Sequence, residues 1–369
     1  MRIGIDYRPV TAAPTSGIAR QVLALEQVLG QLPGSELVRF TAAQDGHAHR
    51  AVACCPPLSI PSHGLHRPRN RWRFEARFLP QALRAQGIDV YIATANSGLP
   101  LRRPLTLRRQ VLLLHDLFQL TLPGRHVDVL RKFVYRAMDR LAIGHAVRAA
   151  DVIWTPSLYS AAEIARLFPH ARGKLRVLPN AVLPLPVPAA HEPGLPSRYW
   201  LVVGSREPRK NLPFFLDAWR RARNAAPQDV PELVVVGQRG DVPASLADAT
   251  GLHWYSGIAD ERLSCLYHEA ERLWHPAWAE GFGLPVVEAL GCGTPVAVAH
   301  GSALDEVAPQ DAPHFDPYDG SALEQLLIGL ARTRRNAGES PEALRDFAGR
   351  FGLDAYAHRV AELVEELRR

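Results

Sequence analysis

The sequence of 369 residues lacks the features that would place it in several common protein classes. No run of 18 or more apolar residues occurs, so no transmembrane helix is expected. The first residues, MRIGIDYRP, have the pattern of a strand ending in an acid and not of a signal peptide. A cytoplasmic protein is therefore expected.

Cysteine is scarce, and the dinucleotide-binding glycine pattern is missing. The four cysteines, Cys54, Cys55, Cys265 and Cys292, have no zinc-like spacing, so we expect small buried thiols. No G-x-G-x-x-G follows any predicted strand, which argues against a dinucleotide-dependent oxidoreductase.

Charge is distributed unevenly along the chain. Residues 1–180 carry 25 basic and 11 acidic residues, a balance of +14. Residues 181–369 carry 18 and 26, a balance of −8, and only 3 of the 43 cations are lysine. A basic first half predicts a partner with phosphates, such as anionic lipid, a lipid-linked diphosphate or nucleic acid.

Strands and helices alternate in both halves, and the length predicts two domains. In the first half we predict strands at 2–6, 90–93, 111–114, 152–155 and 175–178, and helices at 17–29, 127–149 and 160–167. The segment LPLPVPAAHEPGLPS, 183–197, carries five prolines and suits a linker. Beyond it we predict strands at 200–204, 232–237, 252–255, 273–276 and 294–299, and helices at 212–223, 260–270, 285–290, 321–334 and 355–369.

This alternation predicts an α/β protein with two doubly wound parallel sheets. The expected parts are an N-terminal domain at 1–182, a proline-rich linker at 183–198, a C-terminal domain at 199–350 and a terminal helix at 351–369.

Two segments of the second half place candidate binding residues where a strand ends, which is where open parallel sheets bind ligands. VVGSREPRKNL, 202–212, presents Arg206, Arg209 and Lys210, whose charges suit a diphosphate. VVVGQRG, 234–240, ends a strand at Gly237, where a backbone can approach a ligand closely. A solvated basic loop is the alternative for the first segment.

A third segment, EGFGLPVVEALGCGTPVAVAHG at 280–301, has the pattern of loop, helix, turn and strand. Free N–H groups at the helix start favour an anion. Because a carboxylate repels phosphate, Glu288 is better suited to accept hydrogen bonds from the vicinal hydroxyls of a ribose. Glu280, in the loop, could face a second sugar. A capping acid and a surface acid are the alternative for either glutamate alone.

Residues 274–307, WHPAWAEGFGLPVVEALGCGTPVAVAHGSALDEV, resemble the signature of glycosyltransferase family 4, the retaining enzymes of GT-B fold. Glu280 and Glu288 meet the E-x7-E motif of that family. The similarity extends to 208–212, 234–240 and 257–273, and more loosely to 112–123 and 152–182. The resemblance implies two Rossmann-like domains facing a cleft, with a C-terminal helix that packs back toward the N-terminal domain.

The resemblance also implies roles for individual residues. Glu288 would bind the donor ribose, Glu280 would lie near the transferred sugar or the departing phosphate, and Lys210 would hold the diphosphate. The backbone lining the sugar and phosphates would come from Gly281, Phe282, Gly283 and Leu284.

Two further roles lie in the first half. His115, at the end of an apolar strand, would face the donor sugar, although a lone histidine is often only a polar filler. Gly17 would belong to a glycine loop near the diphosphate. Many family members carry Arg where this chain has Ser205, so either Arg206 or Arg209 would be the partner of Lys210.

The donor implied is a nucleotide-diphosphate sugar, a substrate, so no cofactor is expected. The chain has no D-x-D triplet, the usual carboxylate pair for Mg²⁺ on a donor diphosphate, so no metal is expected in the reaction. The resemblance favours GDP-mannose or GDP-rhamnose as donor, and a lipid-linked or lipopolysaccharide glycan as acceptor. A sugar-nucleotide-binding protein without turnover is the alternative, against which the intact Glu280, Glu288 and Lys210 argue.

Basic and aromatic residues alternate in RPRNRWRFEARF, 67–78, where five arginines accompany Trp72, Phe74 and Phe78. The predicted helix at 127–149 adds four more cations: Arg131, Lys132, Arg136 and Arg140. Such surfaces suit anionic membranes or nucleic acid, and a solvated helix face is the third possibility. We expect peripheral contact with the inner face of the plasma membrane and no nucleic-acid partner; the sequence predicts no oligomeric state.

Overall fold

The computed structural model describes residues 1–41, 53–54, 68–122, 129–188, 193–204, 206–333 and 340–369. Its contacts divide the chain into two units, each with its own sheet and core. The first unit comprises Met1–Ala181 and Tyr356–Arg369, and the second comprises Val182–Ala355. The predicted linker at 183–198 therefore falls within the second unit.

A seven-stranded parallel sheet forms the first unit, in the order β3-β2-β1-β4-β5-β6-β7. The strands are β1 (Arg2–Asp6), β2 (Glu36–Thr41), β3 (Ala53–Cys54), β4 (Val90–Ala93), β5 (Arg109–Leu113), β6 (Val152–Thr155) and β7 (Leu175–Val177). The central strands β1, β4 and β5 are almost entirely buried, as expected for a parallel sheet covered on both faces.

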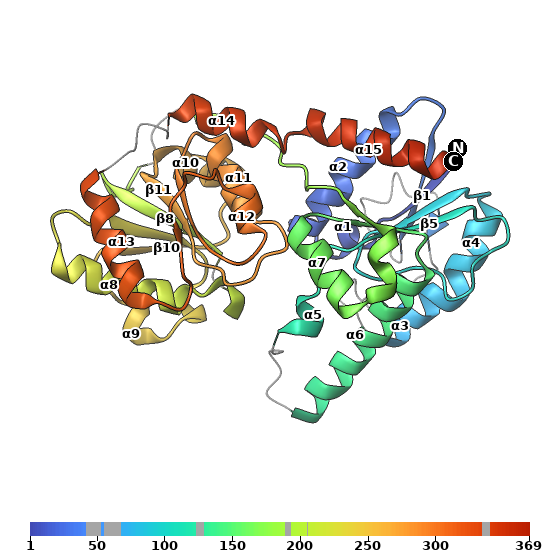
Figure 1. Ribbon diagram of the computed structural model, residues 1–369, viewed down its shortest axis with the longest axis horizontal. Helices are drawn as coiled ribbons and strands as arrows, with labels where there is room; N and C mark the ends of the chain where they lie inside the picture. Colours follow the sequence, from blue (N-terminus) through green and yellow to red (C-terminus); the bar gives the residue numbers. More distant parts are fainter. Residues whose placement is uncertain (42–52, 55–67, 123–128, 189–192, 205, 334–339) are drawn as a thin grey trace. The chain divides into compact units, whose positions relative to one another are not determined.

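Helices cover both faces of this sheet (Figure 1). They are α1 (Arg8–Ala12), α2 (Gly17–Gln31), α3 (Pro68–Arg73), η3 (Phe74–Phe78), α4 (Leu79–Ala85), α5 (Phe118–Thr121), α6 (Val129–Ala149), α7 (Leu158–Leu167), η4 (Pro169–Lys174) and α15 (Leu353–Arg368). Ser16 and Ser157 cap α2 and α7, each accepting a backbone N–H with its hydroxyl oxygen. In the described residues no helix combines the length and the apolar character needed to cross a bilayer.

The helical stretch at 68–85 was not predicted, and it corrects part of the expected basic-aromatic surface. Its middle, η3, is a π-helical turn, and the carbonyl oxygen of Glu75 accepts the N–H of Leu101 at 2.9 Å. Phe74 is 1% exposed, with the Arg8 guanidinium 3.9 Å from its ring centre. Phe74 therefore belongs to the core, whereas Trp72 remains 49% exposed.

A six-stranded parallel sheet forms the second unit, in the order β10-β9-β8-β11-β12-β13. The strands are β8 (Tyr199–Val203), β9 (Glu232–Val236), β10 (Leu252–Tyr255), β11 (Arg272–His275), β12 (Val296–Ala299) and β13 (His314–Phe315). The order reverses between β8 and β11, which makes the gap after these two strands the switch point where doubly wound sheets bind ligands.

Helices flank this sheet as well. They are η5 (Pro208–Lys210), α8 (Leu212–Ala225), η6 (Arg239–Asp241), α9 (Ala244–Ala247), α10 (Asp260–Glu269), α11 (Leu284–Gly291), α12 (Leu304–Val307), α13 (Gly320–Thr333) and α14 (Pro341–Gly349). Helices α8 and α13 pack together on one face, and α10, α11 and α14 pack on the other (Figure 1).

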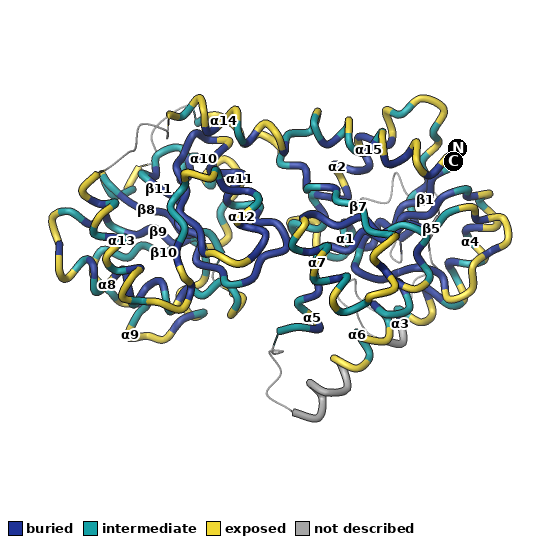
Figure 2. The backbone as a smooth tube through the Cα atoms, in the orientation of Figure 1, coloured by how far each residue is buried: buried dark blue, intermediate teal, exposed yellow. Residues whose placement is uncertain are grey.

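The cores lie along the sheets, where the chain is dark in Figure 2. In the second unit, the fully buried Trp200 and Trp274 pack with ring centres 5.1 Å apart. The predicted pair of doubly wound α/β domains is confirmed. Strands β2, β3 and β13 and helix α14 were not predicted; β3 and β13 have two residues each, too few to show a period.

Buried polar side chains gather at the carboxyl ends of β1, β4 and β5. Arg8 donates to Asp6 at 2.7 Å, and both side chains are buried. The His115 N–H donates to the side-chain oxygen of Asn96 at 2.8 Å, and the His115 Nε2 lies 3.0 Å from the Thr94 carbonyl oxygen. Because a carbonyl only accepts, Nε2 carries the proton. Burial lowers the pKa of His115 to about 4, although the hydrogen bond to Thr94 raises it.

The neutral state of His115 predicts a pH dependence of stability. An unfolded histidine binds a proton near pH 6.5, and His115 in the folded chain does so near 4. Between these values the unfolded state binds more protons, so stability falls as the pH falls, by up to about 3 kcal/mol in total. His115→Gln keeps a donor for Thr94 and should remove this dependence from urea unfolding curves at pH 4.5–7.

The matched control is His358→Gln in α15, whose side chain is 77% exposed. Its curves should follow those of the wild type. Parallel pH profiles for the wild type and His115→Gln would show that His115 takes up its proton equally well in both states.

Candidate functional site

The end of β8 is shaped by a glycine that makes room for a lysine. Gly204 has a φ of +96°, and its N–H donates to the Val236 carbonyl oxygen at 2.9 Å. A Cβ at Gly204 would lie 3.4 Å from the Cε of Lys210. The positive φ and the missing side chain together let Lys210 lie across the end of the strand.

The short helix η5 carries two cations, Arg209 and Lys210. The Lys210 N–H donates to the Glu207 carbonyl oxygen at 2.9 Å, which closes the turn. Asn211 then takes a left-handed conformation, with a φ of 57°, and its side-chain amide donates to the Pro317 carbonyl at 2.9 Å. This residue redirects the chain from η5 into α8.

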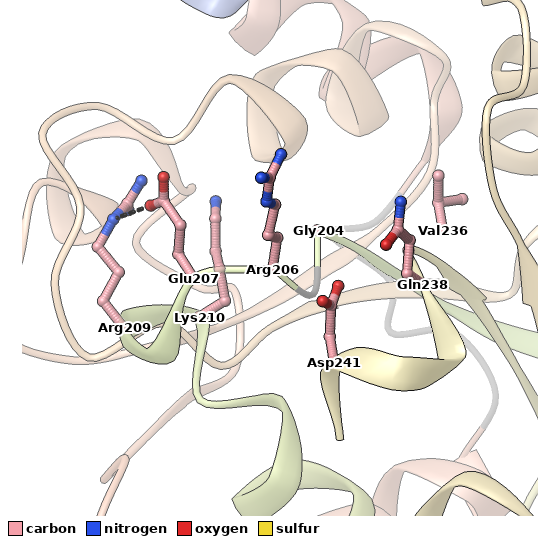
Figure 3. A pocket seen from close by; sticks show the side chains of 9 residues that line it. Gly204, Arg206, Glu207, Arg209, Lys210, Val236, Gln238 and Asp241 are labelled. Carbon is pink, nitrogen blue, oxygen red and sulfur yellow. Dashed lines mark ion pairs between the residues drawn. The ribbon is translucent and has the colours of Figure 1, made fainter. Parts of the chain in front are cut away.

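A cavity of about 320 Å³ opens at the carboxyl ends of β8 and β9, on the β9 side of the switch point. Its lining is Gly204, Arg206, Glu207, Arg209, Lys210, Val236, Gly237, Gln238 and Asp241. Figure 3 shows Arg206 and Lys210 pointing the same way, with Gln238 and Asp241 beside them. Three cations around one cavity favour an anionic ligand, and amide and carboxylate acceptors suit hydroxyl groups.

Glu280 lies behind these cations as a buried, fully engaged carboxylate. One oxygen lies 2.5 Å from the Lys210 Nζ, and the other lies 2.6 Å from an Arg209 terminal nitrogen. Arg209 also pairs with Glu207 at 2.6 Å. Burial by itself would raise the pKa of Glu280, but Lys210, the hydrogen bond from His275 and Arg209 together hold that pKa well below its usual value.

His275, at the end of β11, completes this group and was missed in the sequence. Its Nε2 lies 3.1 Å from Glu280, so this nitrogen carries the proton toward the carboxylate. Burial, followed by the charge of Lys210, lowers the pKa of His275, which keeps the ring neutral. His275 stands at the end of an apolar strand, as His115 does. That position singled out His115 in the sequence and could have identified His275 as well.

Glu288 lies inside α11 with 9% exposure, held from a second helix. The hydroxyl of Tyr267, in α10, donates to a Glu288 carboxylate oxygen at 2.9 Å. Thr294 donates in turn to the Tyr267 carbonyl at 2.5 Å. Tyr267 is fully buried, and no periodicity in the sequence distinguishes it from a core residue.

The loop between the two glutamates packs tightly. Gly283 has a φ of +103°, and a Cβ there would lie 2.7 Å from a methyl carbon of Leu304. The Phe282 ring packs edge-on against Phe351 with centres 5.5 Å apart. Gly281 is buried and Leu284 is half-buried, so the start of α11 is fixed by the packing around it.

The structure brings five of the predicted residues together within the second unit. Arg206, Arg209, Lys210 and Gly237 line the cavity, and Glu280 lies behind two of them. Arg209 is the arginine that shares Glu280 with Lys210; Ser205 lies outside the described residues. Their roles stay predictions.

Glu288 and the 281–284 loop belong to the second unit but are not among the residues that line the cavity, and two predicted residues belong to the first unit. His115 follows β5 as a buried side chain, and Gly17 is the first residue of α2. The arrangement in the second unit can bind a diphosphate through the cations that the buried Glu280 holds in place.

Comparison with known proteins agrees with this chemistry. Residues 189–348 match the family described as glycosyl transferases group 1, and residues 15–184 match glycosyltransferase family 4. The O-antigen chain mannosyltransferase B of Escherichia coli is 31% identical over 351 residues, covering 88% of this chain and 86% of the relative. The O-antigen chain mannosyltransferase RfbU of Salmonella typhimurium is 24% identical over 291 residues, covering 74% and 73%.

A solved structure shares the fold across the whole chain. Anabaena HepE, in complex with UDP and glucose, superposes with a TM-score of 0.66 at 14% identity, covering 99% of this chain and 100% of that one. At this low identity, the similarity to HepE shows a shared fold and nothing about activity. Taken with the family matches and the two parallel sheets, this shows that the chain belongs to the group 1 glycosyltransferases of GT-B fold and is a glycosyltransferase.

Proposed function

We propose that the protein transfers a hexose, with retention of anomeric configuration, from a nucleotide-diphosphate sugar. The observation that carries this proposal is the cavity at the ends of β8 and β9, where Lys210 and Arg209 are both held by the buried Glu280. Cations fixed before the ligand arrives stabilise negative charge without further reorganisation. A leaving nucleoside diphosphate carries such charge.

The activities of the two relatives favour mannose as the sugar. Both are named O-antigen chain mannosyltransferases, so we propose GDP-mannose as the donor, with GDP-rhamnose as its closest competitor. The acceptor would be a lipid-linked or lipopolysaccharide glycan. HepE, which holds UDP and glucose, makes UDP-glucose the donor to test against them.

In the proposed reaction the bond between the sugar C1 and the β-phosphate oxygen breaks, and the acceptor oxygen bonds to C1 on the same face. The acceptor's proton passes to the leaving phosphate oxygen. Lys210, Arg209 and the start of α11 would stabilise the phosphate charge. Glu280 is a positioning residue here, because both of its oxygens are engaged by cations.

A transfer assay with each donor and a glycolipid extract tests this proposal. Lys210→Ala should lower kcat about 100-fold, because it removes a fixed cation from the departing phosphate. Arg220→Ala, which removes an exposed α8 cation paired with Asp217 at 3.0 Å, should leave kcat unchanged. Adding Mg²⁺ to chelator-treated protein should not change kcat. A strict requirement for Mg²⁺, or full activity of Lys210→Ala, would contradict the proposed stabilisation.

The same assay distinguishes sugar transfer from the alternative function, sugar-nucleotide binding without turnover. Donor binding without donor consumption, across acceptor extracts that support transfer by a related mannosyltransferase, would favour the alternative.

The ribose role of Glu288 predicts a loss of discrimination between nucleotides. The wild type should bind GDP about 10-fold or more tightly than 2′,3′-dideoxy-GDP, because a charged acceptor would lose its hydroxyl partners. Glu288→Gln keeps an acceptor for Tyr267 and should bind the two nucleotides almost equally in calorimetry. Glu324→Gln, which removes a carboxylate paired with Arg221 at 2.8 Å elsewhere in the unit, should discriminate like the wild type. Equal discrimination by Glu288→Gln and the wild type would rule out the ribose contact.

Membrane contact is proposed for the surface formed by the described parts of α3 and α6. Trp72 is half-exposed with Arg77 5.3 Å from its ring centre, and Leu141 is 74% exposed beside the exposed Arg140. Arg71 joins the two helices by pairing with Asp139 at 3.4 Å. The side chains of Arg131 and Lys132 lie outside the described part. A mixed basic and aromatic surface suits anionic headgroups.

Flotation with phosphatidylglycerol vesicles at low salt checks this surface. The wild type should float with the vesicles, and a Trp72→Ala, Arg140→Glu double variant should float less, since it loses one aromatic anchor and reverses one charge. Arg220→Glu controls for the change in net charge. Absence of flotation by the wild type, or equal loss in the control, would point to a merely solvated helix face.

A further inference from the structure

Three potential metal ligands gather at the β12–β13 edge of the second sheet, outside the cavity lining. Val298 of β12 pairs with His314 of β13, and the His300 N–H donates to the Phe315 carbonyl oxygen at 2.9 Å. His300 lies two residues beyond Val298, and side chains alternate between faces along a strand, so both histidines lie on one face. Their rings stack with centres 4.8 Å apart. Asp305 joins them from α12.

The ligand atoms lie at distances that suit one small cation. An Asp305 carboxylate oxygen lies 3.3 Å from the His300 Nδ1 and 3.7 Å from the His314 Nε2, and all three atoms lie within 4.8 Å of one another. Ligand atoms around a tetrahedral Zn²⁺ lie about 3.3–3.5 Å apart. The side chains of His300 and Asp305 are exposed enough to move the remaining distance.

Hydrogen bonds already orient two of the three ligands. The His314 Nδ1 lies 2.7 Å from the Ala312 carbonyl, which only accepts, so Nδ1 carries a proton and Nε2 is the ring nitrogen that faces Asp305. The other oxygen of Asp305 accepts the Gly301 N–H at 2.9 Å. Metal-bound histidines and carboxylates usually have such outer hydrogen bonds, because these fix the tautomer and the ligand orientation.

We propose that His300, Asp305 and His314 bind a divalent transition-metal ion, with Zn²⁺ as the expected occupant. Two imidazole nitrogens and a carboxylate oxygen converge within 4.8 Å, and a cation between them would be ligated by all three. Two imidazole nitrogens and one carboxylate favour Zn²⁺ and its first-row neighbours over Mg²⁺ or Ca²⁺. Protonation of the histidines to form an ion pair with Asp305 is the competing arrangement.

This ion would brace the loop that carries Glu280. Helix α12 begins at Leu304, shortly after His300, and the Ala303 N–H donates to the Glu280 carbonyl at 3.3 Å. Leu304 of α12 fills the space beside Gly283. A metal that joins β12, β13 and α12 would therefore fix the position of α12, which packs against the loop at 280–283. This role is structural, takes no part in the sugar transfer, and is independent of the proposed donor.

Zinc titration of tag-free, chelator-treated protein tests the site by calorimetry and by thermal unfolding. We expect about one tightly bound Zn²⁺ per chain and a higher Tm, because a ligand that binds only the folded state stabilises it. Substituting Co²⁺ should give visible absorption of a nitrogen-ligated ion. His300→Ala should weaken Zn²⁺ binding about 10-fold or more, since a chelate with two ligands holds less tightly than one with three.

Two further variants separate ligation from damage to the fold. Asp305→Asn keeps an oxygen for the Gly301 N–H but loses the charge, so it should also weaken Zn²⁺ binding without lowering the Tm of the metal-free protein. His253→Ala is the matched control, because His253 pairs with Glu232 at 2.5 Å on neighbouring strands of the same unit. The control should bind Zn²⁺ like the wild type.

Three results would overturn the site. They are a wild type that binds no Zn²⁺, a wild type that prefers Mg²⁺, and equal Zn²⁺ affinity in the wild type and His300→Ala. Each would show that these three side chains do not form a Zn²⁺ site.

Discussion

The buried carboxylate of Glu280 is the constraint on which the second unit's site depends. A carboxylate removed from water is costly unless charge and hydrogen bonds offset the loss. Lys210, Arg209 and His275 provide both. The two cations follow β8 and His275 ends β11, so that Lys210 lies 70 residues from Glu280 in the sequence and His275 lies 5. Folding of this core therefore aligns two cations before any ligand binds, which is the preorganisation that charge stabilisation requires.

The two units use the same device at the corresponding edge of the sheet. A neutral histidine closes a central strand in each: His115 after β5 and His275 at the end of β11. Each unit also has an asparagine in the left-handed conformation near that edge, Asn96 and Asn211, which redirects the chain where the strands end. Parallel sheets expose their carboxyl ends together, so these edges collect polar groups that burial keeps in a defined protonation state.

Helix α12 connects the two chemical features of the second unit. On one side Leu304 packs against Gly283, and the preceding Ala303 donates to the Glu280 backbone. On the other side Asp305 reaches His300 and His314. A four-residue helix has little stability of its own, so its position depends on these contacts. The loop at 280–283 and the histidine pair are thus supported by the same short element.

The sequence by itself determined the α/β class, the parallel sheets and the segments that reach the site. Strand and helix periods are local properties, and Glu280, Glu288 and Lys210 stand in motifs with fixed spacing. Only the tertiary structure decided that Arg209 shares Glu280 with Lys210, that Phe74 lies in the core under Arg8, and that Tyr267 holds Glu288. It also brought His300 beside His314, because β12 pairs with the two-residue β13. These are contacts between segments far apart in the sequence. Their free energy depends on how deeply the side chains are buried and how closely they approach one another, which the local periodicity of a helix or strand does not determine.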